Sequence, residues 1–151
     1  MMKIICVGKV KEQYLVEAIK EYQKRLSKYT KLEIIEIPDS NDSNISKNLS
    51  IEKEKIEKHI QEKDYVITLE IEGKMLTSIE LSETLNKIEQ HYPNITFVIG
   101  GSYGLDKNIK KRADFALSFS RLTFPHQLFR VLLLEQIYRS YRILNNESYH
   151  K

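Results

Sequence analysis

The sequence has few of the residues that build disulfides, metal sites and membrane spans. Among 151 residues there is one cysteine, Cys6, which excludes an internal disulfide and a cysteine-based zinc site. No apolar run approaches the roughly 18 residues of a membrane-spanning helix, and the apolar stretch before Gly8 is too short for a signal peptide. The length is that of one domain with one core. We therefore expect a soluble, cytoplasmic protein with a single domain, residues 1–151, and no membrane partner.

The net charge of +3 is small but unevenly distributed. Residues 1–105 carry 15 basic and 17 acidic side chains, a net charge of −2, whereas residues 106–151 carry 9 and 4, a net charge of +5. Five of those nine basic residues are arginines, whose guanidinium group binds phosphate as a bidentate fork. A basic C-terminal third is typical both of phosphate or nucleic-acid binding and of a solvated helix face, and composition leaves both interpretations open.

Apolar periodicity predicts strands that alternate with helices along the whole chain. Short apolar runs predict strands over 3–7, 32–37, 65–71, 95–99 and 115–119, and helical spacing predicts helices over 10–29, 50–62, 77–91, 108–113 and 125–144. Thr77 and Glu80 have the spacing of a capping box, and Pro125 suits the first position of a helix. We interpret the polar residues 39–48 as a mobile loop and 145–151 as a polar tail. The alternation indicates an α/β fold, a parallel sheet with helices on both faces.

All five glycines follow the carboxyl ends of predicted strands, the edge at which open parallel sheets bind ligands. A turn explains Gly8, but the run Gly100-Gly101-Ser102-Tyr103-Gly104 has more glycine than a turn requires and would let the backbone approach a ligand. We expect the loops after the last three strands, 69–74, 99–105 and 117–126, to form one site. Their apolar residues and backbone groups suit an uncharged aromatic base such as adenine better than a polyphosphate.

The fingerprints of several common enzyme classes are absent. Neither the dinucleotide-binding Gly-x-Gly-x-x-Gly, nor the phosphate-binding Gly-Lys-Ser/Thr loop, nor the Gly-x-Ser-x-Gly nucleophile elbow occurs. The four histidines lack the spacing of metal ligands, so we expect no metal. These absences argue against a nicotinamide-dependent reductase, an NTPase, a serine hydrolase and a zinc enzyme.

Three ordered motifs and the C-terminus resemble a known family. The motifs are Leu69-Glu70-x-x-Gly73-Lys74, Ile99-Gly100-Gly101-x-x-Gly104 and Leu117-Ser118-x-Ser120-x-Leu122-Thr123-Phe124-x-His126. They resemble the SPOUT RNA methyltransferases, which contain a trefoil knot. The Val7-Gly8-Lys9 start, the run 135–139 and the terminal Glu-Ser-Tyr-His-Lys are similar, more closely, to the RlmH family within that class. The resemblance covers essentially the whole chain, and no motif falls in 39–48.

The resemblance implies a fold, a reaction and partners. The last strand and helix would thread through a loop as a deep C-terminal trefoil knot that binds S-adenosylmethionine, with S-adenosylhomocysteine as product. The reaction implied is methylation of N3 of a pseudouridine in 23S ribosomal RNA, within the assembled ribosome, by a homodimer whose active site uses both chains. By motif match, the expected cofactor-binding residues are Leu69, Gly100, Phe119, Ser120, Arg121, Leu122, Thr123 and Phe124.

Methylation at N3 of a pseudouridine requires the removal of the N3 proton. The imide nitrogen becomes nucleophilic only when its proton leaves, so a group must accept that proton or stabilise the anion. Histidine exchanges protons readily near neutral pH, and the resemblance makes the Tyr149-His150 tail part of the site. We expect His150, Tyr149 and Arg139 to be the catalytic residues, on a tail that is flexible until RNA orders it. His126 is the competing proton acceptor.

The last predicted helix carries arginines and an excess of leucines. Arg130, Arg139 and Arg142 are expected to meet phosphates, although Glu135, one turn before Arg139, could instead hold it in a structural pair. The helix has more leucines than the single stripe that faces the core of one protomer needs, which favours a dimer interface on this helix. The alternative function is a catalytically inactive ribosome- or RNA-binding module of the same fold, which cofactor binding in a titration would exclude.

Overall fold

The computed structural model describes residues 1–151 and contains one sheet of five strands together with five helices. In chain order the elements are β1 (Met2–Val7), α1 (Gln13–Leu26), β2 (Leu32–Ile37), α2 (Ile45–Glu57), β3 (Tyr65–Met75), α3 (Ser78–Glu89), β4 (Ile95–Ile99), α4 (Lys107–Arg112), β5 (Phe115–Ser118) and α5 (His126–Leu144). All strand pairs are parallel, in the order β2-β1-β4-β3-β5, so the predicted fold class is confirmed. None of the helices combines the length and the apolar character that a membrane crossing requires.

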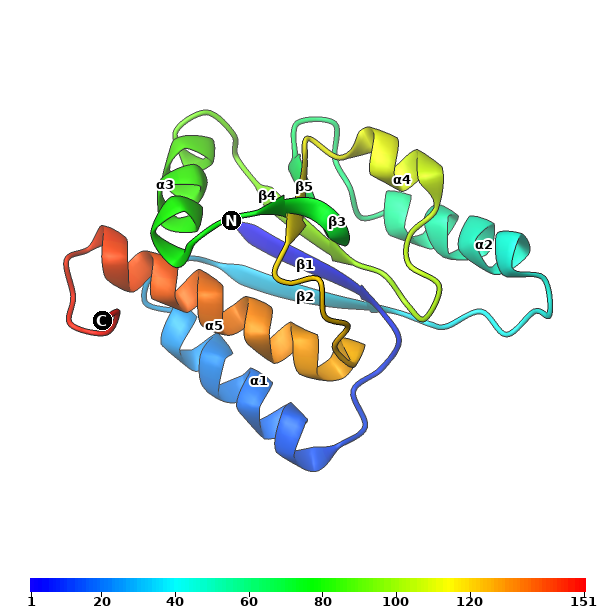
Figure 1. Ribbon diagram of the computed structural model, residues 1–151, viewed down its shortest axis with the longest axis horizontal. Coiled ribbons are helices and arrows are strands. Elements are labelled where there is room, and N and C mark those ends of the chain that lie inside the picture. The colour runs from blue at the N-terminus through cyan, green and yellow to red at the C-terminus, as the bar shows by residue number, and fades with distance from the viewer.

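Helices cover both faces of the sheet (Figure 1). Ile4 of β1 packs in the core beneath α1, α3 and α5, whereas its neighbours Ile5 and Val7 pack on the other face with Ile56 of α2 and Ile109 of α4. Because both faces are covered, β1 and β4 are buried along their whole length, and their sequences are apolar except for Lys3 and Thr96.

The last two elements lie in different parts of the fold. β5 occupies the edge of the sheet beside β3, and the chain then returns across the sheet so that α5 packs between α1 and α3 (Figure 1). The resemblance implies that this last segment also threads through a loop as a trefoil knot, which stays a prediction. The return brings the β5–α5 loop next to the ends of β3 and β4.

β3 continues to Met75, beyond its predicted end before Gly73. Its pairing with β5 jumps from Leu69 to Lys74, and both residues face Leu117, so residues 70–73 arch out of the ladder. A Cβ atom on Gly73 would lie 2.7 Å from the carbonyl oxygen of Ala116. Gly73 therefore allows two strands to cross closely and does not end a strand, which corrects the sequence-based interpretation.

The predicted loop 39–48 is shorter than expected because α2 begins at Ile45. Asn44 caps this helix by accepting a hydrogen bond from the backbone N–H of Lys47 at 3.2 Å. Asn48 accepts another from the backbone N–H of Asp42 at 2.7 Å. Short polar side chains of this kind favour both loops and helix starts, so their composition did not distinguish the two. Accordingly α2 is displaced from the predicted 50–62 to 45–57.

The capping box before α3 is present as predicted. Thr77 Oγ1 accepts from the backbone N–H of Glu80 at 3.1 Å, and Glu80 Oε1 accepts from the backbone N–H of Thr77 at 2.8 Å. Pro125 stands one position earlier than predicted, as the N-cap of α5. In both places the local sequence sets the start of the helix.

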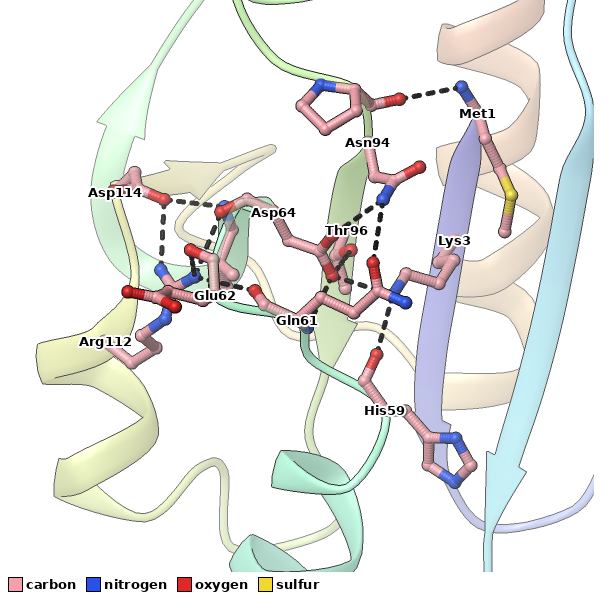
Figure 2. Close-up of polar contacts among 12 residues, drawn as sticks. Met1, Lys3, His59, Gln61, Glu62, Asp64, Asn94, Thr96, Arg112 and Asp114 are labelled. Carbon is pink, nitrogen blue, oxygen red and sulfur yellow. Dashed lines mark hydrogen bonds and ion pairs between the residues drawn. The ribbon is translucent and has the colours of Figure 1, made fainter.

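A buried ion pair ties together the amino ends of the strands (Figure 2). Lys3 of β1 and Asp64, the residue directly before β3, form this pair, with 2.7 Å between Lys3 Nζ and Asp64 Oδ2. Both side chains are almost fully buried. Asp64 also accepts hydrogen bonds from Thr96 Oγ1 of β4 at 3.0 Å, from Asn94 Nδ2 at 2.9 Å and from the backbone N–H of Gln61 at 2.9 Å. Burial alone would raise the pKa of the Asp64 carboxyl, but these donors outweigh it and hold the pKa below its ordinary value. The edge that the sequence predicts to bind ligands is the opposite one.

Candidate active site

The three predicted loops enclose a cavity of about 530 Å³ at the carboxyl edge of the sheet. The volume lies within the range of small-molecule sites, roughly 300–1,000 Å³. Seven of the eight predicted cofactor residues line it: Leu69, Gly100, Phe119, Ser120, Leu122, Thr123 and Phe124. Arg121 alone does not line the cavity and is exposed. The structure therefore brings the motif residues together, and their contacts with a cofactor stay a prediction.

Aromatic rings form one wall of the cavity. Phe119 and Phe124 lie on the β5–α5 loop, and Phe129 of α5 packs against both, with ring centroids 4.9 and 6.3 Å away. Phe129 is absent from the residues predicted from the sequence, although it follows His126 by three positions, a spacing that places both on one face of the helix. This wall offers apolar surface to a planar ring.

The cavity carries more charge than its motifs predict. Glu70 and Glu72 of the β3 arch, Lys110 of α4 and His126 of α5 all line it. Thr68 Oγ1 donates a hydrogen bond to Glu70 Oε2 at 2.6 Å, and Lys110 Nζ lies 3.6 Å from Glu70 Oε1. Carboxylates accept hydrogen bonds from hydroxyl and ammonium groups, so this side suits a ligand with ribose hydroxyls or positive charge. No group of His, Cys, Asp and Glu side chains gathers in a way that would hold a metal ion.

Gly100 is required by its own loop. A Cβ atom at this position would collide with the carbonyl group of Gly104. The loop closes where the N–H of Gly104 donates to the carbonyl oxygen of Gly101 at 3.0 Å, and Gly104 has a positive φ of 80°. Both ends of the loop line the cavity. The contact with the backbone of Gly104 already requires glycine at position 100, whether or not a ligand is bound.

The C-terminal tail is docked on α5 without RNA. Tyr149 Oη donates a hydrogen bond to Glu135 Oε2 at 2.6 Å. Its ring lies edge-on to Tyr138 with centroids 5.0 Å apart, and the guanidinium of Arg139 lies over it at 4.6 Å. Burial and the Glu135 carboxylate raise the pKa of Tyr149 to about 12. These contacts correct the expectation of a tail that is ordered only by RNA.

Arg139 and His150 meet in the same cluster. Arg139 Nε donates to Glu135 Oε1 at 2.7 Å, and Arg139 Nη1 lies 3.1 Å from His150 Nδ1. A guanidinium group can only donate hydrogen bonds, so Nδ1 accepts here and the proton of the neutral ring sits on Nε2. In this tautomer His150 presents an N–H donor and no free base. Glu135, which the sequence left as a structural alternative, is the acceptor that joins Arg139 to Tyr149.

The C-terminal tail follows the last turn of α5, whereas the β5–α5 loop, which lines the cavity, precedes its first turn, so the two lie at opposite ends of the helix (Figure 1). His126, at the start of the helix, lines the cavity, whereas Arg139 lies in its second half. At about 1.5 Å per residue, the helix from 126 to 139 spans about 20 Å. One protomer therefore does not bring its predicted catalytic residues to its own cavity.

Two of the arginines predicted to meet phosphates are engaged within the fold. Arg130 is 2% exposed and donates hydrogen bonds to Glu36 Oε2 and to the carbonyl oxygen of Gly8, each at 2.7 Å. Arg142 forms an ion pair with Glu147 of the tail. A phosphate-binding role for Arg130 is wrong because its guanidinium is buried, and Arg142 instead holds the tail against α5.

Comparison with known proteins gives consistent matches along the whole chain. The family described as "Predicted SPOUT methyltransferase" matches residues 1–150. A protein of Methanococcus maripaludis named "Putative ribosomal RNA large subunit methyltransferase H" is 55% identical over 98% of each chain. One of Caldicellulosiruptor saccharolyticus named "Ribosomal RNA large subunit methyltransferase H" is 51% identical over 100% of each chain. The solved structure of a probable methylase family protein from Haemophilus influenzae shares the fold, with a TM-score of 0.59 at 15% identity over 99% of this chain and 70% of that chain.

Proposed function

The chain belongs to the SPOUT methyltransferase family, and from this membership we propose that it methylates N3 of a pseudouridine in 23S ribosomal RNA with S-adenosylmethionine as methyl donor. Full-length relatives that are 51–55% identical carry the name ribosomal RNA large subunit methyltransferase H. The observation that carries the proposal is the convergence of seven cofactor-motif residues on one cavity. The product is S-adenosylhomocysteine, the substrate is the assembled ribosome, and the cytoplasm is the expected location.

The cavity residues fit S-adenosylmethionine. The phenylalanine wall offers apolar surface to the adenine ring, and the backbone of residues 119–124 offers polar groups to its edge. Glu70 and Glu72 provide acceptors for ribose hydroxyls and negative charge near a sulfonium group. When bound, the cofactor supplies an electrophilic methyl group. The protein aligns the acceptor nitrogen with that methyl group, which converts a bimolecular reaction into an effectively unimolecular one.

A homodimer would complete the site. Because about 20 Å of helix separates the cavity from the tail cluster, a tail that acts at the cavity comes from a second protomer. α5 leaves Leu128 38% exposed, and this apolar side chain on the cavity end of the helix is available for a two-fold contact. We infer an active site made of the cavity of one chain and the tail of its partner.

In this composite site His150 acts as a hydrogen-bond donor. Its Nε2–H can bind a carbonyl oxygen of the imide as negative charge develops there, which stabilises the transition state. The Arg139 guanidinium donates a hydrogen bond to Nδ1 of His150 and adds positive charge beside the ring. Glu135 and the ring of Tyr149 hold Arg139 in place. The N3 proton then requires another acceptor. His126 lines the cavity and takes that role, with water as the alternative.

The direct test is methylation of large ribosomal subunits from a strain that lacks the modification. With labelled S-adenosylmethionine, the wild-type protein should transfer one methyl group per subunit to N3 of a pseudouridine, mapped by mass spectrometry of 23S RNA fragments. A protein that binds the subunits but does not bind S-adenosylmethionine in a titration would instead be the inactive RNA-binding module.

The shared site is tested by mixing two inactive variants. Phe124→Ala damages the cavity, and His150→Ala damages the tail. If each site combines one cavity with the partner's tail, a mixed dimer keeps one intact site, so random mixing should restore about a quarter of wild-type activity. No recovery after subunit exchange, verified with differently tagged chains, would show that each protomer uses its own tail.

A further inference from the structure

Tyr103 is an exposed aromatic side chain without a partner in the protein. It is 61% exposed, its hydroxyl makes no hydrogen bond, and its ring contacts no other aromatic ring or cation. By contrast Tyr92, which is 41% exposed, lies edge-on to Tyr65 with ring centroids 5.0 Å apart. The turn between Gly101 and Gly104 that carries Tyr103 is closed by its own backbone hydrogen bond. The fold thus displays this ring on a defined turn and gives it nothing to pack against.

The turn forms part of the rim of the cavity. The neighbours of Tyr103 on both sides, Ser102 and Gly104, line the cavity. Across it, the β5–α5 loop contributes Leu122, which also lines the cavity and is 70% exposed. Both loops lie at the same edge of the sheet (Figure 1). With the proposed methyl donor in this cavity, a nucleotide that approaches the methyl group would lie close to this rim.

We propose that Tyr103 stacks on an unpaired base of the RNA substrate at the rim of the cofactor cavity, beside the target nucleotide. The proposal rests on the proposed function and names a contact of that site. Aromatic side chains bind single-stranded RNA by stacking on bases, whatever the sequence, because every base presents a flat face. An exposed ring on a hydrogen-bonded turn at the rim of the cavity has the geometry for this contact.

The charges around the rim favour RNA over a second copy of the chain. Arg121, next to Leu122, is exposed and forms no ion pair, and α4 after the turn carries Lys107 and Lys111, which are exposed and also form none. The acidic groups nearby are Glu70, which pairs with Lys110, Asp106, which caps α4, and the exposed Glu72, so unpaired positive charge is in excess. These positive groups attract phosphates, whereas a second copy would bring the same positive charges. Arg121 is thus assigned to a phosphate near the stacked base, consistent with its position outside the cavity.

The test compares Tyr103→Ala, Tyr103→Phe and Tyr103→Trp on unmodified large ribosomal subunits. Stacking on a base contributes enough that Tyr103→Ala should raise the Kd for subunits, and the KM, by about 5- to 150-fold. Tyr103→Phe and Tyr103→Trp should retain wild-type values because the flat ring remains. The Kd for S-adenosylmethionine should be unchanged in all three. Tyr92→Ala, at the opposite edge of the sheet, is the matched control and should leave the Kd for subunits unchanged.

A second readout uses the absence of tryptophan from the chain. Tyr103→Trp introduces the only tryptophan, which can be excited apart from the tyrosines, and its emission should be quenched when subunits are added, whereas Tyr92→Trp should not respond. An unchanged Kd for Tyr103→Ala would overturn the proposal even if the wild type methylates RNA normally. Loss of the dimer in Tyr103→Ala, seen by sedimentation, would overturn it by assigning the ring to the protomer interface. If the wild type bound subunits without methylating them, the proposed function would fail, and the Kd comparison would still decide the stacking.

Discussion

Tyr149→Phe removes one hydroxyl group and leaves the ring that packs against α5. The interaction lost is the 2.6 Å hydrogen bond to the Glu135 carboxylate. Hydrogen bonds to charged groups contribute about 1.5–3 kcal/mol, and partial exposure favours the lower end of that range. We therefore expect docking of the tail to weaken by about 1.5 kcal/mol, roughly tenfold in the ratio of docked to undocked tail.

Tyr149→Ala removes the ring as well. It loses the edge-on contact with Tyr138, about 0.5–1.5 kcal/mol, and the contact with the Arg139 guanidinium, about 0.5–1 kcal/mol at an exposed site. The total loss is about 3 kcal/mol, a factor of roughly one hundred in the docking ratio. The methylation rate should follow this order, mildly reduced in Tyr149→Phe and severely reduced in Tyr149→Ala.

Hydrogen exchange of the backbone amides of Asn146 and Glu147, which donate to carbonyl oxygens of α5, reports docking and needs no RNA. Exchange should be about tenfold faster in Tyr149→Phe and about a hundredfold faster in Tyr149→Ala than in the wild type. Tyr103→Phe, whose hydroxyl makes no hydrogen bond, is the matched control and should exchange like the wild type. Equal exchange in the wild type and in Tyr149→Ala would refute the docked tail.

The same hydrogen bond makes docking dependent on pH. The pKa of Tyr149 is about 12 in the folded protein, raised by burial and by Glu135, against about 10 for a free tyrosine. Because the docked state binds this proton more tightly, its contribution is complete below about pH 10 and is lost as the pH rises through about 12. Tail exchange should therefore show an extra acceleration in this window, which Tyr149→Phe should abolish. An acceleration that persists in Tyr149→Phe would belong to another group.

Three further perturbations test the fold around the site. Asp64→Ala leaves the Lys3 ammonium buried without a counter-charge, so the free energy of unfolding measured in urea should fall by about 3–5 kcal/mol. A loss below about 1 kcal/mol would mean that water solvates the ammonium instead. The Cys6 thiol, whose pKa burial raises to about 11, should react with a thiol reagent at about pH 8 only after unfolding, and rapid labelling of the native protein would contradict its burial. Gly100→Ala should weaken S-adenosylmethionine binding, measured by calorimetry, at least about tenfold because the loop must move to admit the methyl group. Gly104→Ala has space for its methyl group but requires a positive φ, so it should lower the free energy of unfolding by about 1–2 kcal/mol.

Local sequence predicted most of the secondary structure because its causes are local. A short run rich in β-branched residues, such as 95–99, favours a strand covered on both faces. The Thr77 and Glu80 side chains can close a capping box without help from the rest of the chain. The motif residues of the strand-end loops were also predictable as a group. Carboxyl ends of parallel strands meet at one edge of the sheet, so loops far apart in the sequence share a site.

What the sequence could not determine depends on contacts between distant segments. Gly73 resembled the end of a strand in the sequence. The residue that requires glycine there is Ala116 of β5, whose carbonyl group leaves no room for a Cβ atom and which lies more than forty positions away in the chain. Residues 69–74 were predicted to lie at the site, but the arch within β3 that places Glu70 and Glu72 in the cavity wall depends on the pairing with β5 and has no periodic signal in the sequence. Arg130 could equally have faced phosphate or the core; packing of α5 against β1 buried it, since burial is decided by which faces meet. The predicted helix over 125–144 already separates the cavity loop from the tail, but only the structure shows that the tail docks on the second half of α5, away from its own cavity. That distance is what makes a second chain necessary for the proposed site.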